Sequence, residues 1–325
     1  MGMEQSRKRK MLWQLPLLVF LIVGTVLIIR QQRSMPYQHD EGFIFGTVYS
    51  VTYQSEQNLK AEIEAALMQV DAEFSMFNDT STVSRINRGE QPPRSAMFNE
   101  VFQLAQTVHQ ETEGAFDITV APLVNAWGFG FKHEQMPTRQ QVDSLLKIRN
   151  QYDFSAIAKG YGSDVVARLL RSCDVSNFMV EIGGEVVTQG VSAKRLPWRI
   201  GVTKPTDDSL SVSGELQTVL NVTDMAMATS GNYRNFYYKG GKKYAHTIDP
   251  KTGYPVQHSL LSATVLAKSC ATADAYATSF MVMGMERAKA VLDRHPELMA
   301  YFIYAQPDGS NSVWFSPTLK KKIEE

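Results

Sequence analysis

Apolar residues recur at helical spacing in several stretches of this chain and at alternating positions in others. Leu59, Ile63, Leu67 and Phe74 follow the three- to four-residue spacing of an amphipathic helix. The same spacing predicts helices over residues 58–74, 99–111, 138–148, 158–171, 271–283 and 286–295. Alternation and short apolar runs predict strands over residues 42–53, 177–182, 198–202, 215–222, 225–228, 236–238, 244–248, 262–266 and 300–304.

Turn signals separate many of these predicted strands. The segment Lys239-Gly240-Gly241-Lys242 is typical of a tight hairpin between two strands. Helices occur in groups between the strands and do not alternate with them one by one, as they would in a doubly wound parallel sheet. The pattern therefore predicts an α+β fold with mostly antiparallel sheets and flanking helices.

Residues 11–29 form a long apolar run in which Gln14 is the only strongly polar side chain. About 20 apolar residues are needed to cross a bilayer as a helix, and no small-residue cleavage site follows the run. An uncleaved transmembrane signal anchor is favoured, and a cleaved signal peptide is the alternative. Basic residues before the run place residues 1–10 in the cytoplasm. Residues 30–41 are then a linker, and residues 42–325 form one domain outside the cytoplasmic membrane.

Composition and charge narrow the class of function. The 325 residues include 33 basic and 33 acidic side chains, so the formal net charge is zero and no nucleic-acid partner is expected. With 44% hydrophobic residues the chain can bury a sizeable core. The sequence contains neither zinc-ligand spacing nor a G-x-S-x-G, Walker or Rossmann pattern. Its chemistry must come from another arrangement of side chains.

Residues 228–277 combine hydroxyls, histidines and acids with several chain reversals. His246 comes shortly before a turn at Asp249 and is a candidate base, because histidine exchanges protons near neutral pH. Asp274 and Thr278 are four residues apart in a helical pattern, which places a carboxylate and a hydroxyl on one helix face. Oxygen ligands of this kind suit magnesium. Spacing leaves open the alternative that Asp274 only stabilises its helix and Thr278 only packs.

Two further segments carry weaker signals. Lys159 lies near a predicted helix N-terminus, where free N–H groups and the helix dipole favour an anion, although such lysines are commonly just solvated. Phe116, Trp127 and Phe129 belong to segments typical of ligand-facing loops, and packing inside the core is the alternative interpretation.

Six segments together carry a resemblance that no single motif provides. They read F-D-I-T-V-A-P-L-V-N-A-W-G-F-G (116–130), D-F-S-A-I-A-K-G-Y-G-S-D (153–164), E-I-G-G-E (181–185), A-T-S-G-N-Y (228–233), H-T-I-D-P-K-T-G-Y-P-V (246–256) and A-D-A-Y-A-T (273–278). In this order they resemble the FAD:protein FMN transferases, the ApbE flavin transferase family. The resemblance covers roughly residues 42–315.

This resemblance implies a magnesium-dependent enzyme with FAD as its substrate. Family members split the pyrophosphate of FAD, attach FMN through a phosphoester to a threonine or serine hydroxyl of an acceptor protein, and release AMP. The expected location is a single-pass protein of the cytoplasmic membrane, with the flavin transferase domain on the periplasmic side. The apolar helix would replace the lipid-bearing cysteine that is common in the family.

The resemblance also assigns roles to individual residues. The family's metal ligands match Asp274 and Thr278, with the main-chain carbonyl of Ala156 as a third. His246 matches the histidine suited to take the proton from the acceptor hydroxyl. The FAD-contacting positions match Met76, Ala115, Phe116, Asp117, Asp153 and Lys159.

Two other functions compete with the transferase. FAD hydrolysis to FMN and AMP would use the same metal site with water in place of the acceptor hydroxyl, and the sequence does not separate these two reactions. A flavin-binding protein without turnover is the third hypothesis. The presence of His246 together with Asp274 and Thr278 argues against it, because binding alone needs neither a base nor a metal site.

Overall fold

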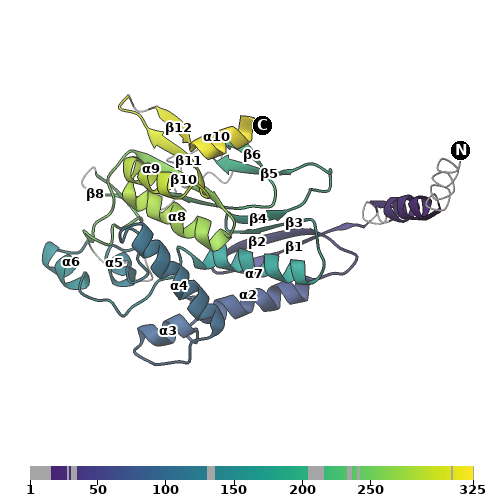
Figure 1. Ribbon diagram of the computed structural model, residues 1–325. Coiled ribbons are helices and arrows are strands. Elements are labelled where there is room, and N and C mark those ends of the chain that lie inside the picture. The colour runs from purple at the N-terminus through teal and green to yellow at the C-terminus, as the bar shows by residue number, and fades with distance from the viewer. Residues whose placement is uncertain are drawn as a thin grey trace, which may run out of the picture.

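One large sheet with helices packed on it organises the protein. The computed structural model describes residues 16–27, 29–30, 35–129, 136–203, 216–232, 236–239, 242–308 and 310–324. In the described part, an eight-stranded sheet has the strand order β1-β2-β3-β4-β7-β10-β11-β12, and each pair of neighbours is antiparallel. Figure 1 shows helices α7 and α8 lying across one face of this sheet. The expected α+β architecture with antiparallel strands and flanking helices is confirmed.

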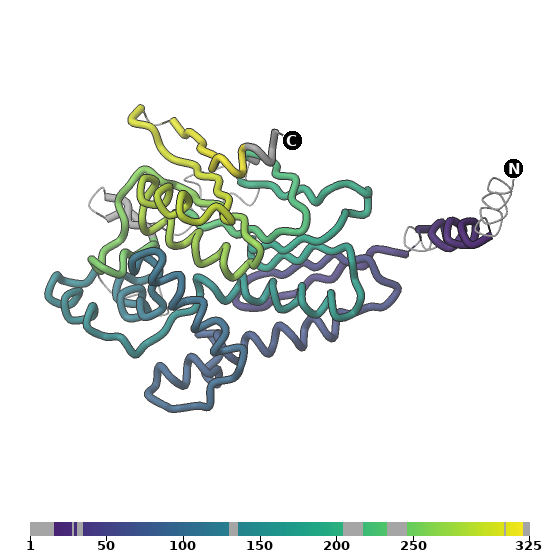
Figure 2. The backbone as a smooth tube through the Cα atoms, viewed as in Figure 1, coloured from purple at the N-terminus to yellow at the C-terminus, as the bar shows by residue number. Residues whose placement is uncertain are grey.

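The strands of the large sheet come from both ends of the chain. They are β1 (Tyr37–Ile44), β2 (Thr47–Gln54), β3 (Phe178–Ile182), β4 (Glu185–Gln189), β7 (Ala226–Gly231), β10 (Leu260–Ala267), β11 (Met299–Ala305) and β12 (Asn311–Phe315). Two small hairpins pair β5 (Trp198–Thr203) with β6 (Leu216–Val222) and β8 (Phe236–Lys239) with β9 (Lys242–Ala245). Figure 2 follows the chain and shows the early strands β1 and β2 beside the later β3 and β4.

Side-chain caps fix where several helices begin. The hydroxyls of Ser81, Ser95, Thr138 and Ser269 each accept a hydrogen bond from a first-turn N–H group, which satisfies a donor that the helix leaves free. The helices are α2 (Lys60–Phe74), α3 (Thr82–Asn87), α4 (Ala96–Glu111), α5 (Ala121–Ala126), α6 (Arg139–Leu145), α7 (Ala158–Ser172), α8 (Cys270–Met283), α9 (Met285–Arg294) and α10 (Pro317–Glu324).

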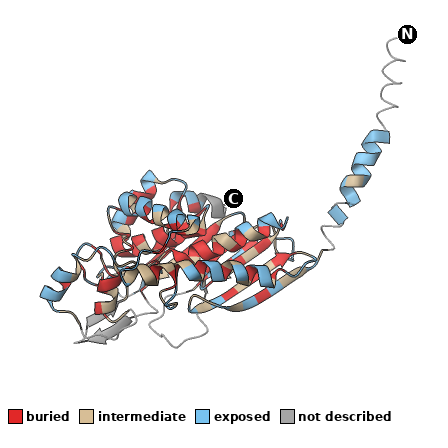
Figure 3. Ribbon diagram, turned by 90° about the horizontal axis from the view of Figure 1, so that it is seen from below, coloured by how far each residue is buried: buried red, intermediate tan, exposed pale blue. Residues whose placement is uncertain are grey.

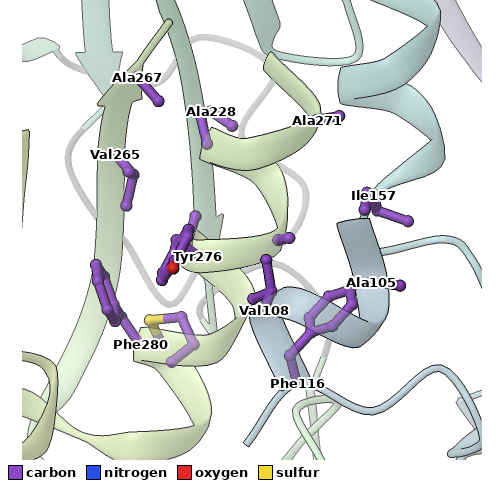
Figure 4. Packing of buried hydrophobic residues seen from close by; sticks show 14 of the residues in the cluster. Ala105, Val108, Phe116, Ile157, Ala228, Val265, Ala267, Ala271, Tyr276 and Phe280 are labelled. Carbon is purple, nitrogen blue, oxygen red and sulfur yellow. The ribbon is translucent and has the colours of Figure 1, made fainter. Parts of the chain in front are cut away.

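Helix α8 lies at the centre of the main core. It is buried on nearly all sides, unlike the amphipathic α4 and α7 beside it. Figure 4 shows Tyr276 and Phe280 of α8 facing Val265 of β10, with Val108 of α4 on the other side of the helix. Each large apolar side chain buried in this way contributes about 1.5–3 kcal/mol to stability. Figure 3 shows the resulting band of buried residues between the sheet and its helices.

The opposite face of the sheet is covered in part by the β5–β6 hairpin. Its inward residues alternate along the strands, as a half-buried sheet requires. Ile200 and Leu220 pack with Val186 of β4 and Met227 of β7 in a separate apolar cluster. The sheet is thus packed on both faces near β4 and β7, which makes these strands a rigid support for the residues that project from them.

The structure differs from the predicted elements near the first strand. The predicted strand 42–53 is two strands joined by a turn at Phe45 and Gly46, whose φ angles of 52° and 75° are both positive. Alternation continues through such a turn, so it does not reveal the reversal. Strand β1 begins at Tyr37, within the segment that its polar composition predicts as a linker.

Elements in three other places were missed, one of them the short helix α5 (Ala121–Ala126) in a segment predicted as loop. Gly183 and Gly184, with φ of 63° and 103°, form the turn between β3 and β4, and strand β4 itself was not predicted. Strand β12 and helix α10 near the C-terminus were not predicted either. Glycine is needed at Gly183 and Gly184 because side chains rarely adopt such φ angles.

The predicted anchor 11–29 is only partly described. Residues 11–15 and 28 lie outside the described residues, whereas 16–27 are helical and their large apolar side chains are exposed (Figure 3). In the described part of the chain, no helix is both long and apolar enough to cross a membrane.

Candidate functional site

A cavity of about 1030 Å³ is lined by residues of the large sheet, of α7 and α8, and of the loops beside them. Its walls come from segments spread between Phe45 and Val282. Every residue that the sequence analysis assigned to the site lines this cavity: Met76, Ala115, Phe116, Asp117, Asp153, Ala156, Lys159, His246, Asp274 and Thr278. Residues separated by up to two hundred positions in the chain therefore meet in one place.

Helix α8 presents Asp274 and Thr278 to the cavity from one face. Asp274 is only 3% exposed, and its Oδ2 accepts a hydrogen bond of 3.1 Å from the main-chain N–H of Gly160. The hydroxyl of Thr278 lies 3.1 Å from the hydroxyl of Ser230 on β7. Burial raises the pKa of Asp274, although the Lys159 ammonium acts in the opposite direction. Buried negative charge of this kind is stabilised by a cation.

Helix α7 approaches α8 closely at its first turn because residue 160 is glycine. A Cβ atom at Gly160 would lie 2.4 Å from the main-chain oxygen of Cys270, a distance that real side chains do not reach. This close approach brings Lys159 beside α8. The N-terminus of α8 is held by Asp164 of α7, whose carboxylate accepts hydrogen bonds of 2.8 and 2.9 Å from the N–H groups of Cys270 and Ala271.

Lys159, whose side chain is 31% exposed, forms an ion pair with the buried Glu185 of β4. Its Nζ atom lies 2.6 Å from Oε1 of Glu185, whose side chain is only 3% exposed. Burial raises the pKa of Glu185 to about 8; the Lys159 ammonium counteracts this rise, and the Asp274 carboxylate adds to it. Burial lowers the pKa of Lys159, but Glu185 and Asp274 outweigh this effect and the net pKa is raised. The two shifts therefore have different main causes: burial for Glu185, and the two neighbouring carboxylates for Lys159.

The segment from Ala115 to Asp117 forms another wall of the cavity. Phe116 is buried in the main core and also reaches the cavity, so both interpretations of this residue hold. Asp117 accepts hydrogen bonds of 2.8 and 2.7 Å from the N–H and hydroxyl of Thr119, and one of 2.7 Å from Arg149. Asp153 donates its N–H to the carbonyl of Ile118 at 2.7 Å. These contacts tie the two predicted FAD-contacting segments to each other.

His246 follows strand β9 and precedes a short bridge between Ile248 and Pro255. Its ring lies at the cavity wall, with the ring centre 6.4 Å from that of Phe129. The turn after His246 is fastened by Trp127, whose indole N–H donates a 2.7 Å hydrogen bond to the carbonyl of Gly253. Trp127 is buried and does not line the cavity, so packing is the correct interpretation of this tryptophan, whereas Phe129 does face the cavity.

Among the cavity residues that the sequence analysis did not assign to the site, three have side chains suited to bind a ligand. Glu185 ends the E-I-G-G-E segment, and a carboxylate directly after a Gly-Gly turn was the available signal. Phe45 and Phe77 are aromatic residues at chain reversals that line the cavity, and Phe77 is 72% exposed. An exposed aromatic ring beside Met76 offers a flat apolar surface for a planar ligand.

The oxygen atoms at the site fit a hard divalent cation. Asp274 supplies a buried carboxylate and Thr278 a hydroxyl, and Ala156, whose main-chain carbonyl is the predicted third ligand, lines the same cavity. Such a set with few protein ligands suits magnesium, which keeps positions for water and substrate phosphate. Among the described residues, no group of three or more His, Cys, Asp or Glu side chains is placed to hold a metal ion. The predicted magnesium site has one carboxylate, that of Asp274, and its other ligands are a hydroxyl and a main-chain carbonyl, so it differs from a site built from three such side chains.

Comparisons with known proteins identify one family over most of the chain. The model of the ApbE family matches residues 45–302. A Vibrio cholerae protein named FAD:protein FMN transferase is 36% identical over 332 residues, covering 92% of this chain and 98% of the relative. A Haemophilus influenzae protein of the same name is 37% identical, covering 87% of this chain and 90% of the relative.

Solved structures show the same fold. The flavin transferase ApbE from Vibrio cholerae superimposes with a TM-score of 0.79 at 34% identity, covering 88% of this chain and 99% of that one. The ApbE protein from Thermotoga maritima has a TM-score of 0.75 at 26% identity, with coverage of 88% and 99%. The family model and these relatives span most of the chain, including the segments that line the cavity. The chain belongs to the ApbE family.

Proposed function

We propose that this protein transfers FMN from FAD to a threonine or serine hydroxyl of an acceptor protein, in a magnesium-dependent reaction that releases AMP. The observation that carries the proposal is the meeting of Lys159, Asp274, Thr278 and His246 in one cavity. The fold is that of solved flavin transferases, and the curated relatives cited above carry the name of this activity.

Charge neutralisation is the first requirement of the reaction. Cleavage of a pyrophosphate needs positive charge at the phosphoryl oxygens and a leaving group held in line. Lys159 offers an ammonium at the cavity wall. Asp274, Thr278 and the carbonyl of Ala156 would hold magnesium, which when bound neutralises charge on the phosphoryl oxygens. Asp274 is kept in place by the N–H of Gly160, and Thr278 by Ser230.

Proton removal from the acceptor is the second requirement. A threonine hydroxyl is a weak nucleophile, and a positioned base contributes about 10²- to 10⁴-fold to such a step. His246 takes the hydroxyl proton while the acceptor oxygen bonds to the phosphorus of the FMN half. The bond between this phosphorus and the oxygen bridging to the AMP half breaks, and AMP leaves with that oxygen. The bridge after His246 and the hydrogen bond from Trp127 to Gly253 hold this loop in position.

The remaining cavity residues bind the rest of FAD. Ala115, Phe116, Asp117 and Asp153 form a wall joined by hydrogen bonds, with polar groups for the hydroxyls of the substrate. Phe45, Met76 and Phe77 provide apolar surface for a planar ring, and Met76 also packs against the main core.

We also propose that the protein is a single-pass protein of the cytoplasmic membrane, with residues 1–10 in the cytoplasm and the flavin transferase domain on the periplasmic side. The apolar run 11–29 and the basic residues before it support this location. The exposed apolar side chains of the helix at 16–27 support it as well.

Intact-mass analysis tests the proposed reaction. The protein is incubated with FAD, magnesium and a protein domain that presents an exposed threonine, and each product is weighed. We expect the acceptor to gain the mass of FMN in phosphoester linkage, with AMP released in equal amount and no gain after chelation of the metal. Free FMN and AMP with an unmodified acceptor would favour FAD hydrolysis, and unchanged FAD would reject both reactions.

A further inference from the structure

The buried charges around Lys159 do not balance. Lys159 is the cation of a cluster in which it faces two carboxylates, those of Glu185 and Asp274. A third carboxylate, Asp164, raises the pKa of Asp274, but its own charge is met by two N–H groups at the start of α8. With both facing carboxylates ionised, the cluster has a net charge of about −1, which is unfavourable in a buried place.

Glu185 is held rigidly in this cluster. The hydroxyl of Ser163 donates a 3.0 Å hydrogen bond to the main-chain carbonyl of Glu185, and the Gly183-Gly184 turn fixes the start of β4. Its Oε1 atom accepts from Lys159 at 2.6 Å, whereas its buried Oε2 atom has no hydrogen-bond partner among the described residues. A buried acceptor without a partner costs about 1–3 kcal/mol. An ion pair that served stability alone would not be expected to keep this cost.

We propose that Glu185 makes the binding of the FAD pyrophosphate depend on a divalent cation. This inference rests on the proposed function and adds a positioning residue to its site. In the protein without metal, once Glu185 is ionised above about pH 8, it neutralises Lys159. Asp274 then leaves the site negative, so that the site repels a pyrophosphate. A cation of charge +2 held by Asp274 and Thr278 reverses the sign, and Lys159 is then able to donate to the substrate. Substrate and metal thus bind as a coupled pair.

The coupling between FAD binding and metal binding depends on the charge of Glu185 and not on the shape of its side chain. The variant Glu185→Gln keeps the size of the side chain and its hydrogen bond to Lys159 but removes the charge. We expect this variant to bind FAD without metal about tenfold more tightly than the unchanged protein, since one nearby charge alters such equilibria by one to three powers of ten. Its affinity for magnesium alone should fall by a similar factor.

The test measures FAD affinity by quenching of flavin fluorescence, once with a chelator present and once with excess magnesium. The measurements are made at pH 9, where the carboxyl of Glu185 is ionised. Calorimetric titration with magnesium alone gives a second readout that does not involve FAD. Glu185→Asp keeps the charge and should keep most of the dependence of FAD binding on metal. Ser163→Ala disturbs the same piece of backbone without changing charge, and should leave the ratio of the two FAD affinities unchanged.

The outcomes separate this inference from the function on which it rests. A Glu185→Gln variant with the same ratio of affinities as the unchanged protein would overturn the role of the charge. Equal weakening of FAD binding with and without metal would make Glu185 a structural residue and would also overturn it. An unchanged protein that binds no FAD in either condition would reject the proposed function, and the inference would fail with it. Because binding is reciprocal, FAD must also strengthen magnesium binding less in Glu185→Gln than in the unchanged protein.

Discussion

At the scale of single residues, the site is a set of buried charges kept within reach of one another. Asp274 is 3% exposed and faces Lys159, which in turn is paired with Glu185 at 2.6 Å. Desolvation makes each of these charges costly, and their mutual attraction offsets that cost only in part. The remaining negative charge favours the cation proposed above, so we expect changes to single side chains here to affect chemistry more than folding.

Replacement of Asp274 by asparagine should remove magnesium-dependent transfer. The variant keeps the volume of the side chain but loses the carboxylate, and the loss of one such electrostatic group costs about 10²- to 10³-fold in rate. Steady-state transfer assays with FAD and an acceptor give the rate, and thermal unfolding checks the fold. Full activity at ordinary magnesium concentration would remove Asp274 from the metal site.

Replacement of His246 by alanine should separate binding from transfer. We expect a rate lower by about 10²- to 10⁴-fold, because the acceptor hydroxyl loses its base. FAD affinity, measured by flavin fluorescence, should stay close to that of the unchanged protein. Unimpaired transfer would reject the role of this histidine as a base.

The pKa of Glu185 predicts how stability depends on pH. Burial raises this pKa from 4.5 to about 8, so between these values the folded protein holds a proton that the unfolded chain has lost. The contribution of Glu185 to the free energy of unfolding is therefore fully present below pH 4.5 and is lost as pH rises to about 8. Denaturant unfolding of the metal-free protein from pH 5 to 9 should show this fall. Glu185→Gln should reduce it, whereas a change at the exposed Glu62 should not.

At the scale of elements, the site depends on how closely α7 and α8 approach each other. Gly160 allows the first turn of α7 to lie against the start of α8, and its N–H group donates to Asp274. Asp164, one turn later, binds the first N–H groups of α8. One helix thus supplies Lys159 and also fixes the helix that carries the predicted metal ligands. A small increase in the distance between the two helices would therefore displace both Lys159 and the predicted metal ligands.

Replacement of Gly160 by alanine tests this dependence. The new Cβ atom would lie 2.4 Å from the carbonyl oxygen of Cys270, which is main chain and cannot rotate away. We expect a loss of stability of about 1–3 kcal/mol from overpacking, together with weaker magnesium binding. Gly162→Ala is the matched control, because its Cβ would meet the ring of Phe45 at 2.8 Å, and a side chain can move. Equal effects of the two changes on stability would contradict this account.

At the scale of the whole molecule, the functional site belongs entirely to the domain that follows the N-terminal helix. The residues that line the cavity lie between Phe45 and Val282. The helix at 16–27 contributes none of them. The proposed membrane anchor and the proposed chemistry therefore involve different parts of the chain.

Removal of residues 1–34 should leave the reaction intact. The shortened protein begins just before β1 and retains every strand of the large sheet. We expect its rate of FMN transfer in solution to equal that of the full chain, while only the full chain sediments with lipid vesicles. Sedimentation of both forms, or of neither, would contradict the proposed anchor.

Much of the secondary structure could be predicted from local pattern, for a physical reason. Residues such as Ile63 and Leu67 face a core, and their spacing follows directly from helical geometry. The turn at Phe45 and Gly46 was missed because alternation of apolar residues is the same on the two sides of a hairpin. Strand β4 was missed because its residues are buried on both faces and do not alternate.

The family, the main elements and the types of residue at the site could be read from the chain alone, since ordered motifs and side-chain periodicity are local properties. The folded structure was needed to show that Trp127 packs while Phe129 faces the cavity, and that Glu185 pairs with Lys159. Those contacts join residues far apart in sequence, and the energy of a buried charge depends on which groups surround it. The balance of charge at the site is therefore a property of the folded molecule.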